Sequence, residues 1–210
     1  IGETYYGLAQ SSGEDPATAG NFYDQAAKAY QAILDRAKED PKFIDPARLT
    51  GVRLRLVNCK REKGSFEEAL ELVKTIIAEN PRSLDAQVEA NFIFQDWGAS
   101  GQGDSWKKYE DAMRGDKTSG LWGWIDTARR MQALLNQGGA DAKDRYENRY
   151  YEARYNLTRC SLELGLAQTG AKKTEALETA KTQVVQFVAI TGDFNEEWWP
   201  KFDGIYREIQ

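Results

Sequence analysis

Two cysteines are the first residues of this sequence whose chemistry could carry a function. Cys59 lies beside Lys60 and Arg61, and nearby cations can lower the pKa of a thiol and make it a nucleophile. Residues adjacent in a helix do not face each other, which argues against such activation. Cys59 and Cys160 instead share a position, three residues after a leucine and five before a glycine. We therefore predict that both are buried, unreactive side chains that act as small hydrophobes.

The glycine-rich stretch GASGQGDS at 98–105 has the glycine spacing of a phosphate-binding loop. Asp104 stands where such a loop carries its lysine, and a carboxylate there would repel phosphate oxygens. The stretch follows no strand pattern, so we interpret it as a turn inserted between helices. No segment has the alternating ligands of a calcium loop. The sequence predicts neither a metal site nor a cofactor.

The composition excludes several classes of function. Histidine is absent, which removes Ser-His-Asp and Cys-His catalysis as well as imidazole zinc sites, and we predict that the protein is not an enzyme. A net charge of −5 argues against binding to nucleic acid or to anionic membranes. The longest apolar stretch, VVQFVAI at 184–190, is too short to cross a bilayer. The chain opens at Ile1 without a methionine, so we expect a soluble segment of a larger or processed protein. Its compartment, cytoplasmic or bacterial extracytoplasmic, stays open.

Helical periodicity dominates the sequence. In residues 21–41 apolar side chains recur at steps of three and four, which predicts an amphipathic helix closed by Pro41. Two further helices are predicted at 46–63 and 65–79, separated by Gly64. No segment alternates with the period of two that strands require. The sequence therefore predicts an all-α fold.

Local signals mark where these helices begin and where loops interrupt them. Ser65 and Glu68 have the spacing of a capping box at the start of the helix at 65–79. Clusters of glycine at 98–103, 115–123 and 138–139 predict connections between helices.

An internal period of 34 residues relates parts of the chain. The stretches LVNCKREKG, ANFIFQDWG and LTRCSLELG end at Gly64, Gly98 and Gly165. The first two glycines are 34 residues apart, and the third follows after 67, one short of two periods. Such a period predicts stacked supersecondary units, each a pair of helices.

The paired helices resemble the tetratricopeptide repeat (TPR). The best match is residues 50–81, with Leu56 in the first helix, Gly64 at the turn, and Phe66 and Ala69 in the second helix before Pro81. The resemblance implies a right-handed superhelical array of antiparallel helix hairpins, a TPR-like α-solenoid of about four or five hairpins. It implies a single domain over 1–210, with divergent C-terminal hairpins at 120–210.

In the TPR family the first helices of the hairpins line a concave groove that binds proteins or peptides. The resemblance therefore implies a non-catalytic scaffold whose partner is a protein or peptide segment. Transferred position by position, the groove would be lined by Leu54, Asn58 and Arg61, by Val88, Phe92 and Gln95, and by Tyr155 and Arg159.

The segment RYENRYYEARYNLTR at 145–159 interleaves arginine with tyrosine, residues that are enriched in binding hot spots. It fits either a recognition surface or a buried aromatic face with arginines stacked over it, and the sequence leaves both open.

Six tryptophans support an alternative function. Exposed tryptophan stacks on sugars, so the alternative is a glycan-binding or carbohydrate-processing helical protein that uses tryptophan and a carboxylate pair. We predict that Trp106 and Trp122 pack between repeats. Neighbours on a helix cannot both face the core, so one member of the pair Trp198 and Trp199 should be partly exposed.

Overall fold

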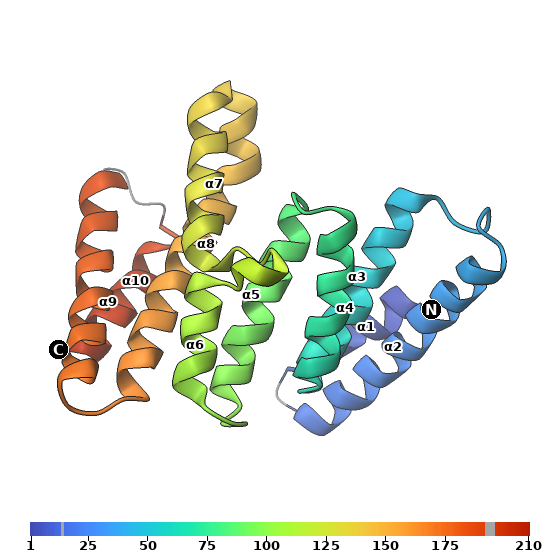
Figure 1. Cartoon of the computed structure of the whole chain (residues 1–210), viewed down its shortest axis with the longest axis horizontal. Coiled ribbons are helices and arrows are strands. Elements are labelled where there is room, and N and C mark those ends of the chain that lie inside the picture. Colours follow the sequence, from blue (N-terminus) through green and yellow to red (C-terminus); the bar gives the residue numbers. More distant parts are fainter. Residues whose placement is uncertain (14, 192–195) are drawn as a thin grey trace. The chain divides into compact units, whose positions relative to one another are not determined.

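The computed structural model describes residues 1–13, 15–191 and 196–210. Within these residues the chain forms ten α-helices, most of them packed against their neighbours in sequence (Figure 1). The prediction of an all-α fold is confirmed. The helices group into two compact units, Ile1–Asp96 and Trp97–Gln210, called unit 1 and unit 2 below.

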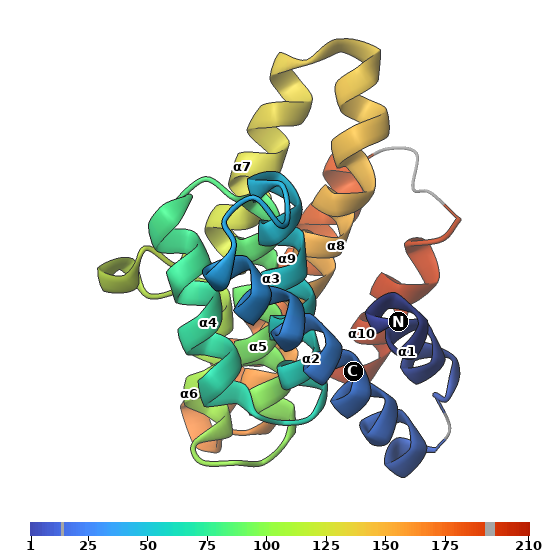
Figure 2. The ribbon, with the colours of Figure 1, turned by 90° about the vertical axis from the view of Figure 1, so that its right-hand side faces the viewer.

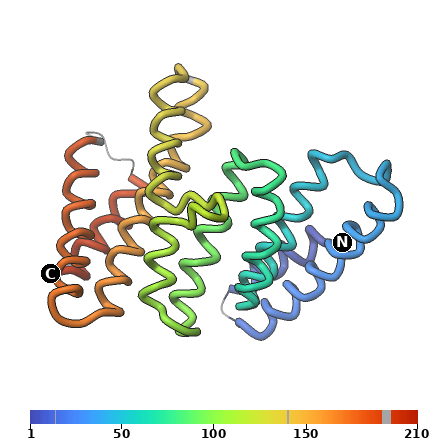
Figure 3. The backbone as a smooth tube through the Cα atoms, in the orientation of Figure 1, coloured from blue at the N-terminus to red at the C-terminus, as the bar shows by residue number. Residues whose placement is uncertain are grey.

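Unit 1 contains helices that run in alternating directions from α2 onward, as the backbone trace in Figure 3 shows. The helices are α1 (Gly2–Ser11), α2 (Pro16–Glu39), α3 (Pro46–Glu62), α4 (Phe66–Glu79) and α5 (Leu84–Ala99), the last of which extends into unit 2. The helices predicted at 46–63 and 65–79 are therefore confirmed to within a residue or two.

The ends of these helices follow from local chemistry. Asp15 and Asp45 cap α2 and α3, each accepting hydrogen bonds from backbone N–H groups of the first turn, and a proline follows each of them. After α3, Gly64 adopts a positive φ of 76°. The N–H groups of Gly64 and Ser65 donate to the carbonyl oxygens of Arg61 and Lys60, at 2.8 and 2.9 Å. This pattern is a Schellman motif, and it confirms Gly64 as the terminator of α3.

The capping box predicted for α4 is wrong. Ser65 occupies the N-cap position, but its side chain accepts no hydrogen bond there. The Glu68 carboxylate instead lies 2.5 Å from Nζ of Lys60 on α3. Glu68 thus forms an ion pair with a neighbouring helix instead of the predicted cap with Ser65. The spacing of two residues in the sequence does not reveal such a tertiary contact.

The apolar core of unit 1 lies where α1, α2, α3 and α4 meet. Its buried members come from different helices and include Tyr6, Tyr30, Leu56 and Cys59. Ala26 and Ala69 are fully buried, and small side chains at such positions let neighbouring helices approach closely. The stripe of apolar positions read from residues 21–41 supplies the α2 side of this core.

Unit 2 is organised around one long helix. Its helices are α6 (Ser105–Arg114), α7 (Gly123–Gln137), α8 (Gly139–Leu166), α9 (Gly170–Thr191) and α10 (Trp199–Ile209), and the connection between α6 and α7 contains a short 3₁₀ turn at Lys117–Ser119. Helix α8 packs against α6, α7, α9 and α10. The hairpin of α7 and the first turns of α8 extends beyond the other helices of this unit (Figures 1 and 2).

Aromatic side chains fill the core of unit 2. The Phe187 ring on α9 lies 4.8 Å from that of Phe202 on α10, and 5.7 Å from those of Tyr150 and Tyr151 on α8. Trp198 is 6% exposed and completes the cluster. Large rings at these separations contribute contact energy beyond the area that they bury, so they hold α8, α9 and α10 together.

Two of the repeat glycines play a different role from Gly64. Gly98 and Gly165 lie inside helices, one residue before the ends of α5 and α8. A Cβ atom on Gly98 would lie 3.0 Å from the Tyr109 ring, and one on Gly165 would lie 2.8 Å from Leu177. At these positions glycine permits the close approach of a side chain from a neighbouring helix.

The connection between α6 and α7 provides a stability test. Gly115 has φ 71° and ψ −171°, a conformation open almost only to glycine, and a Cβ there would lie 2.2 Å from the Leu121 carbonyl oxygen. Gly115→Ala should lower the free energy of unfolding by roughly 3 kcal/mol or more, measured by urea denaturation.

Gly103 is the matched control because it also has a positive φ, 75°, but a Cβ there meets no atom within 4 Å. Gly103→Ala should cost only about 1 kcal/mol. Equal losses in the two variants would contradict the close packing at Gly115.

Candidate functional site

The structure brings three of the predicted groove residues together. Asn58 and Arg61 on α3 face α5, where the Phe92 ring centroid lies 5.5 Å from the Arg61 guanidinium carbon. Glu89, one turn before Phe92, links the pair because Arg61 Nε donates to it at 2.8 Å and Asn58 Nδ2 at 3.4 Å. We call these four residues with Glu62 and Asp96 the α3–α5 face.

Arg61 is the centre of this face. Its side chain is 11% exposed and forms ion pairs with Glu62 at 3.0 Å, with Glu89 and with Asp96. Burial alone lowers the pKa of a guanidinium, but the charges of Glu89 and Asp96 outweigh it and raise the pKa of Arg61. The arginine is thus held charged, in a fixed position, between two helices.

Negative charge exceeds positive charge on the α3–α5 face. Three carboxylates surround one guanidinium. Burial, and then the charges of Asp96 and Glu89, raise the pKa of Glu62 in spite of the opposing effect of Arg61. A second positive charge would therefore be stabilised on this face.

The other groove positions predicted for unit 1 lie near this face. Leu54 is partly buried one turn before Asn58 on α3. Val88 and Gln95 are partly buried on α5, on either side of Phe92 in the sequence. They remain predicted contacts of a partner.

Tyr155 and Arg159, the predicted groove residues of unit 2, contact helix α10. The Tyr155 ring packs on Trp198 and Phe202, with centroids at 6.0 and 5.7 Å. Arg159 pairs with Glu208 at 2.8 Å and with Glu163 at 2.6 Å. These two residues of the segment 145–159 therefore make contacts inside unit 2, Tyr155 through its ring and Arg159 through ion pairs.

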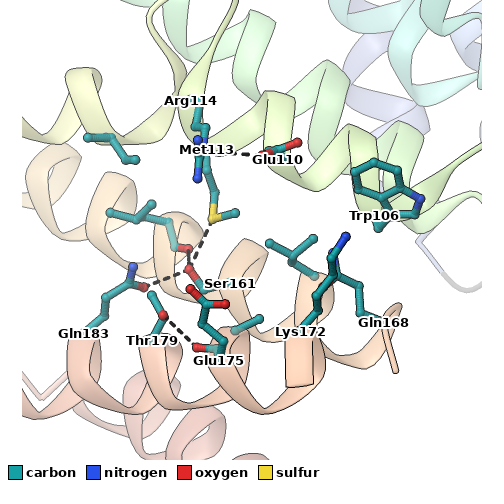
Figure 4. Close-up of a pocket in the computed structure, with 14 residues that line it drawn as sticks. Trp106, Glu110, Met113, Arg114, Ser161, Gln168, Lys172, Glu175, Thr179 and Gln183 are labelled. Carbon is teal, nitrogen blue, oxygen red and sulfur yellow. Dashed lines mark hydrogen bonds and ion pairs between the residues drawn. The ribbon is translucent and has the colours of Figure 1, made fainter. Parts of the chain in front are cut away.

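Unit 2 contains a cleft that the sequence did not predict. It encloses about 340 Å³ between α6 and α9, with α8 as its floor, and we call it the Trp106 cleft (Figure 4). Trp106 is 39% exposed and lies at one end, facing Gln168 and Lys172. The prediction that Trp106 packs between repeats is wrong. Trp106 lies in the first turn of the short helix α6, and its side chain is exposed at the end of the cleft.

The floor of the Trp106 cleft is ordered by a buried hydroxyl. Ser161 on α8 is 2% exposed, and its Oγ lies 3.1 Å from the Leu157 carbonyl oxygen and 3.1 Å from Gln183 Oε1. Gln183 on α9 is therefore oriented by α8. In the sequence, only the tryptophan at position 106 and the mixture of polar and apolar residues in α9 indicate such a cleft. Neither signal shows which helices form its walls.

Of the other tryptophans, the pair at 198 and 199 divides as predicted, whereas Trp122, predicted to pack between repeats, is only partly buried. Trp199 is 46% exposed while Trp198 is buried, which confirms that only one of this pair faces the core. Trp124 is fully buried, and partly buried Trp122 lies under Arg130.

Among the described residues no cluster of histidine, cysteine or carboxylate side chains is large enough to hold a metal ion. In the same part of the chain no helix combines the length and the apolar character needed to cross a bilayer.

No family model, no curated protein and no solved structure matches this chain.

Both cysteines occupy the core. Cys59 and Cys160 are fully buried, as predicted, and burial raises the pKa of the Cys59 thiol to about 12. We expect neither thiol to react with a water-soluble disulfide reagent in the folded protein at mildly alkaline pH, and both to react after denaturation. Labelling of the native protein, followed by absorbance, would contradict this burial.

The raised pKa of Glu62 predicts a pH-dependent effect on stability. Folding raises the pKa of this carboxyl, so its protonated form favours the folded state. This contribution to stability is fully present below the ordinary pKa of 4.5, and it is lost as the pH rises through the pKa of the folded protein. Glu62→Gln should therefore raise the melting temperature at neutral pH and converge with the wild type in acid.

The exposed Glu67 on α4 is a suitable control, and Glu67→Gln should leave the melting temperature unchanged. A lower melting temperature for Glu62→Gln at neutral pH would mean that its ion pair with Arg61 outweighs the repulsion from Glu89 and Asp96.

Proposed function

We propose that the chain is a non-catalytic scaffold that binds a protein or peptide segment, with hairpins stacked as in a TPR-like array. The observation that carries the proposal is a row of helices in unit 1. Glu3 on α1 accepts from Arg55 on α3 at 3.2 Å, and Tyr6 donates to Asn58 at 2.6 Å. Asn58 and Arg61 reach α5 in turn through Glu89.

Helices α1, α3 and α5 are the first helices of successive hairpins. Side-by-side contact between first helices is the arrangement that stacked hairpins produce, and their shared surface forms the binding face of such arrays. The antiparallel partners α2 and α4 pack against α3 from the apolar side. This division of apolar and polar sides supports the TPR-like interpretation of residues 50–81.

The chemistry of the α3–α5 face favours a basic partner. Its excess of carboxylates attracts lysine or arginine, and Phe92 offers an aromatic contact beside them. Because Arg61 is already neutralised by its neighbours, it serves to position Glu89 and Asp96. We therefore propose a peptide segment that carries a cation close to an apolar side chain.

The proposal includes no catalytic step. The chain has no histidine, and both thiols are buried. The carboxylates of the α3–α5 face surround a guanidinium, an arrangement that suits electrostatic recognition.

Selection of a random-peptide library against the full chain tests this proposal. The selected peptides should be basic, and calorimetry should show that Phe92→Ala weakens their binding about tenfold or more, which corresponds to about 1.4 kcal/mol. Leu54→Ala, on α3, is a second variant in case Phe92→Ala alters folding.

Phe43 is the matched control, since it is 49% exposed in the connection between α2 and α3. Phe43→Ala should leave the dissociation constant unchanged. Failure to select any peptide, or equal weakening by the Phe43 and Phe92 variants, would contradict the proposed face.

A further inference from the structure

We propose that the Trp106 cleft of unit 2 is a second binding site, and that its ligand is a neutral saccharide. The inference is independent of the α3–α5 face, which lies in unit 1. It rests on the aromatic wall of the cleft, the balance of its charges, its size, and its hydrogen-bonding groups.

The aromatic wall favours a ligand with an apolar face. Trp106 exposes 39% of its surface at the end of the cleft, and apolar side chains of α8 and α9, among them Leu164 and Ala176, continue this surface. A sugar ring presents a face of C–H groups that can pack on an indole, with hydroxyl groups around its edge. Aromatic rings with an exposed face are suited to such contacts.

The charges of the cleft cancel. Its lining holds two cations, Arg114 and Lys172, and two acids, Glu110 and Glu175. Glu110 lies 3.7 Å from Arg114 and 3.6 Å from Lys107, so it is already compensated on its own helix. A site for a phosphorylated ligand would show an excess of positive charge, and the balance here favours a neutral one.

The size of the cleft favours a small ligand over a folded partner. A volume of about 340 Å³ lies near the lower end of the range of small-molecule sites, roughly 300–1,000 Å³. A stable protein interface covers a much wider surface, on the order of 800 Å² on each partner. A short oligosaccharide fits these dimensions.

The polar lining supplies both donors and acceptors. Gln168 and Gln183 can donate and accept, Lys172 donates, and Glu175 accepts. Lys172, Glu175 and Gln183 lie on α9 and Gln168 in the connection before it, and Figure 4 shows them on the side of the cleft away from Glu110 on α6. Hydroxyl groups need partners of both kinds, so this mixture suits the rim of a sugar ring.

Titration of the full chain with neutral tetrasaccharides of glucose, xylose, mannose and N-acetylglucosamine tests the proposal. Saturation-transfer NMR should detect binding of at least one of them, and calorimetry should give its dissociation constant. Trp106→Ala should weaken binding at least about tenfold, in line with the loss of a stacked ring. Lys172→Ala, at an exposed position across the cleft, should also weaken it and serves if the first variant does not fold.

Trp199 is the matched control. It is 46% exposed in the same unit, but it lies in the separate cleft between α9 and α10, which is lined mainly by valines and aromatic side chains. Trp199→Ala should leave the dissociation constant unchanged. The proposal is overturned if none of the tetrasaccharides binds at millimolar concentration, or if the Trp199 and Trp106 variants lose affinity equally.

Discussion

The ion pairs of Arg61 are the interaction on which the polar side of unit 1 depends. A guanidinium that is 11% exposed must be neutralised where it lies, because leaving it unpaired would cost several kcal/mol. The carboxylates of Glu89 and Asp96 on α5, and that of Glu62 on α3 itself, neutralise the guanidinium. The ion pairs thereby fix how α3 and α5 face each other, while Leu56 and Cys59 bury the opposite side of α3.

Unit 2 is held by a different kind of contact. Its long helix α8 contributes Tyr150, Tyr151 and Tyr155 to a cluster of rings with α9 and α10. The ion pairs of Arg159 lie at the edge of this cluster, where solvent screens them, and exposed pairs of this kind contribute little to stability. The rings therefore hold this part of the chain together, and the last helix, α10, covers the aromatic side chains of α8 and α9.

The two candidate sites differ in what they can recognise. The α3–α5 face is crowded with carboxylates around one fixed cation and presents Phe92 beside them. The Trp106 cleft is a smaller hollow with balanced charges and a partly exposed indole. A charged, extended segment suits the first, and a compact neutral ligand suits the second. The chain could accordingly hold two ligands of unrelated chemistry.

The sequence by itself determined the all-α class, the positions of α3 and α4, and the burial of the cysteines. Periodicity located α3 and α4 to within a residue or two, and the Gly64 terminator depends only on the backbone of the turn that contains it. It also placed Asn58, Arg61 and Phe92 in one predicted set of residues, although not their partners. These features are local, so a short window of residues carries the information.

The tertiary structure alone decided which charges meet and which aromatic side chains stay exposed. Arg61 is paired with residues 28 and 35 positions away, and Glu68 is paired with Lys60 where the sequence suggested a helix cap. Tyr155 is covered by α10, while the walls of the Trp106 cleft come from helices distant in sequence. Periodicity tells which face of a helix is apolar, but it does not tell which other helix will cover that face.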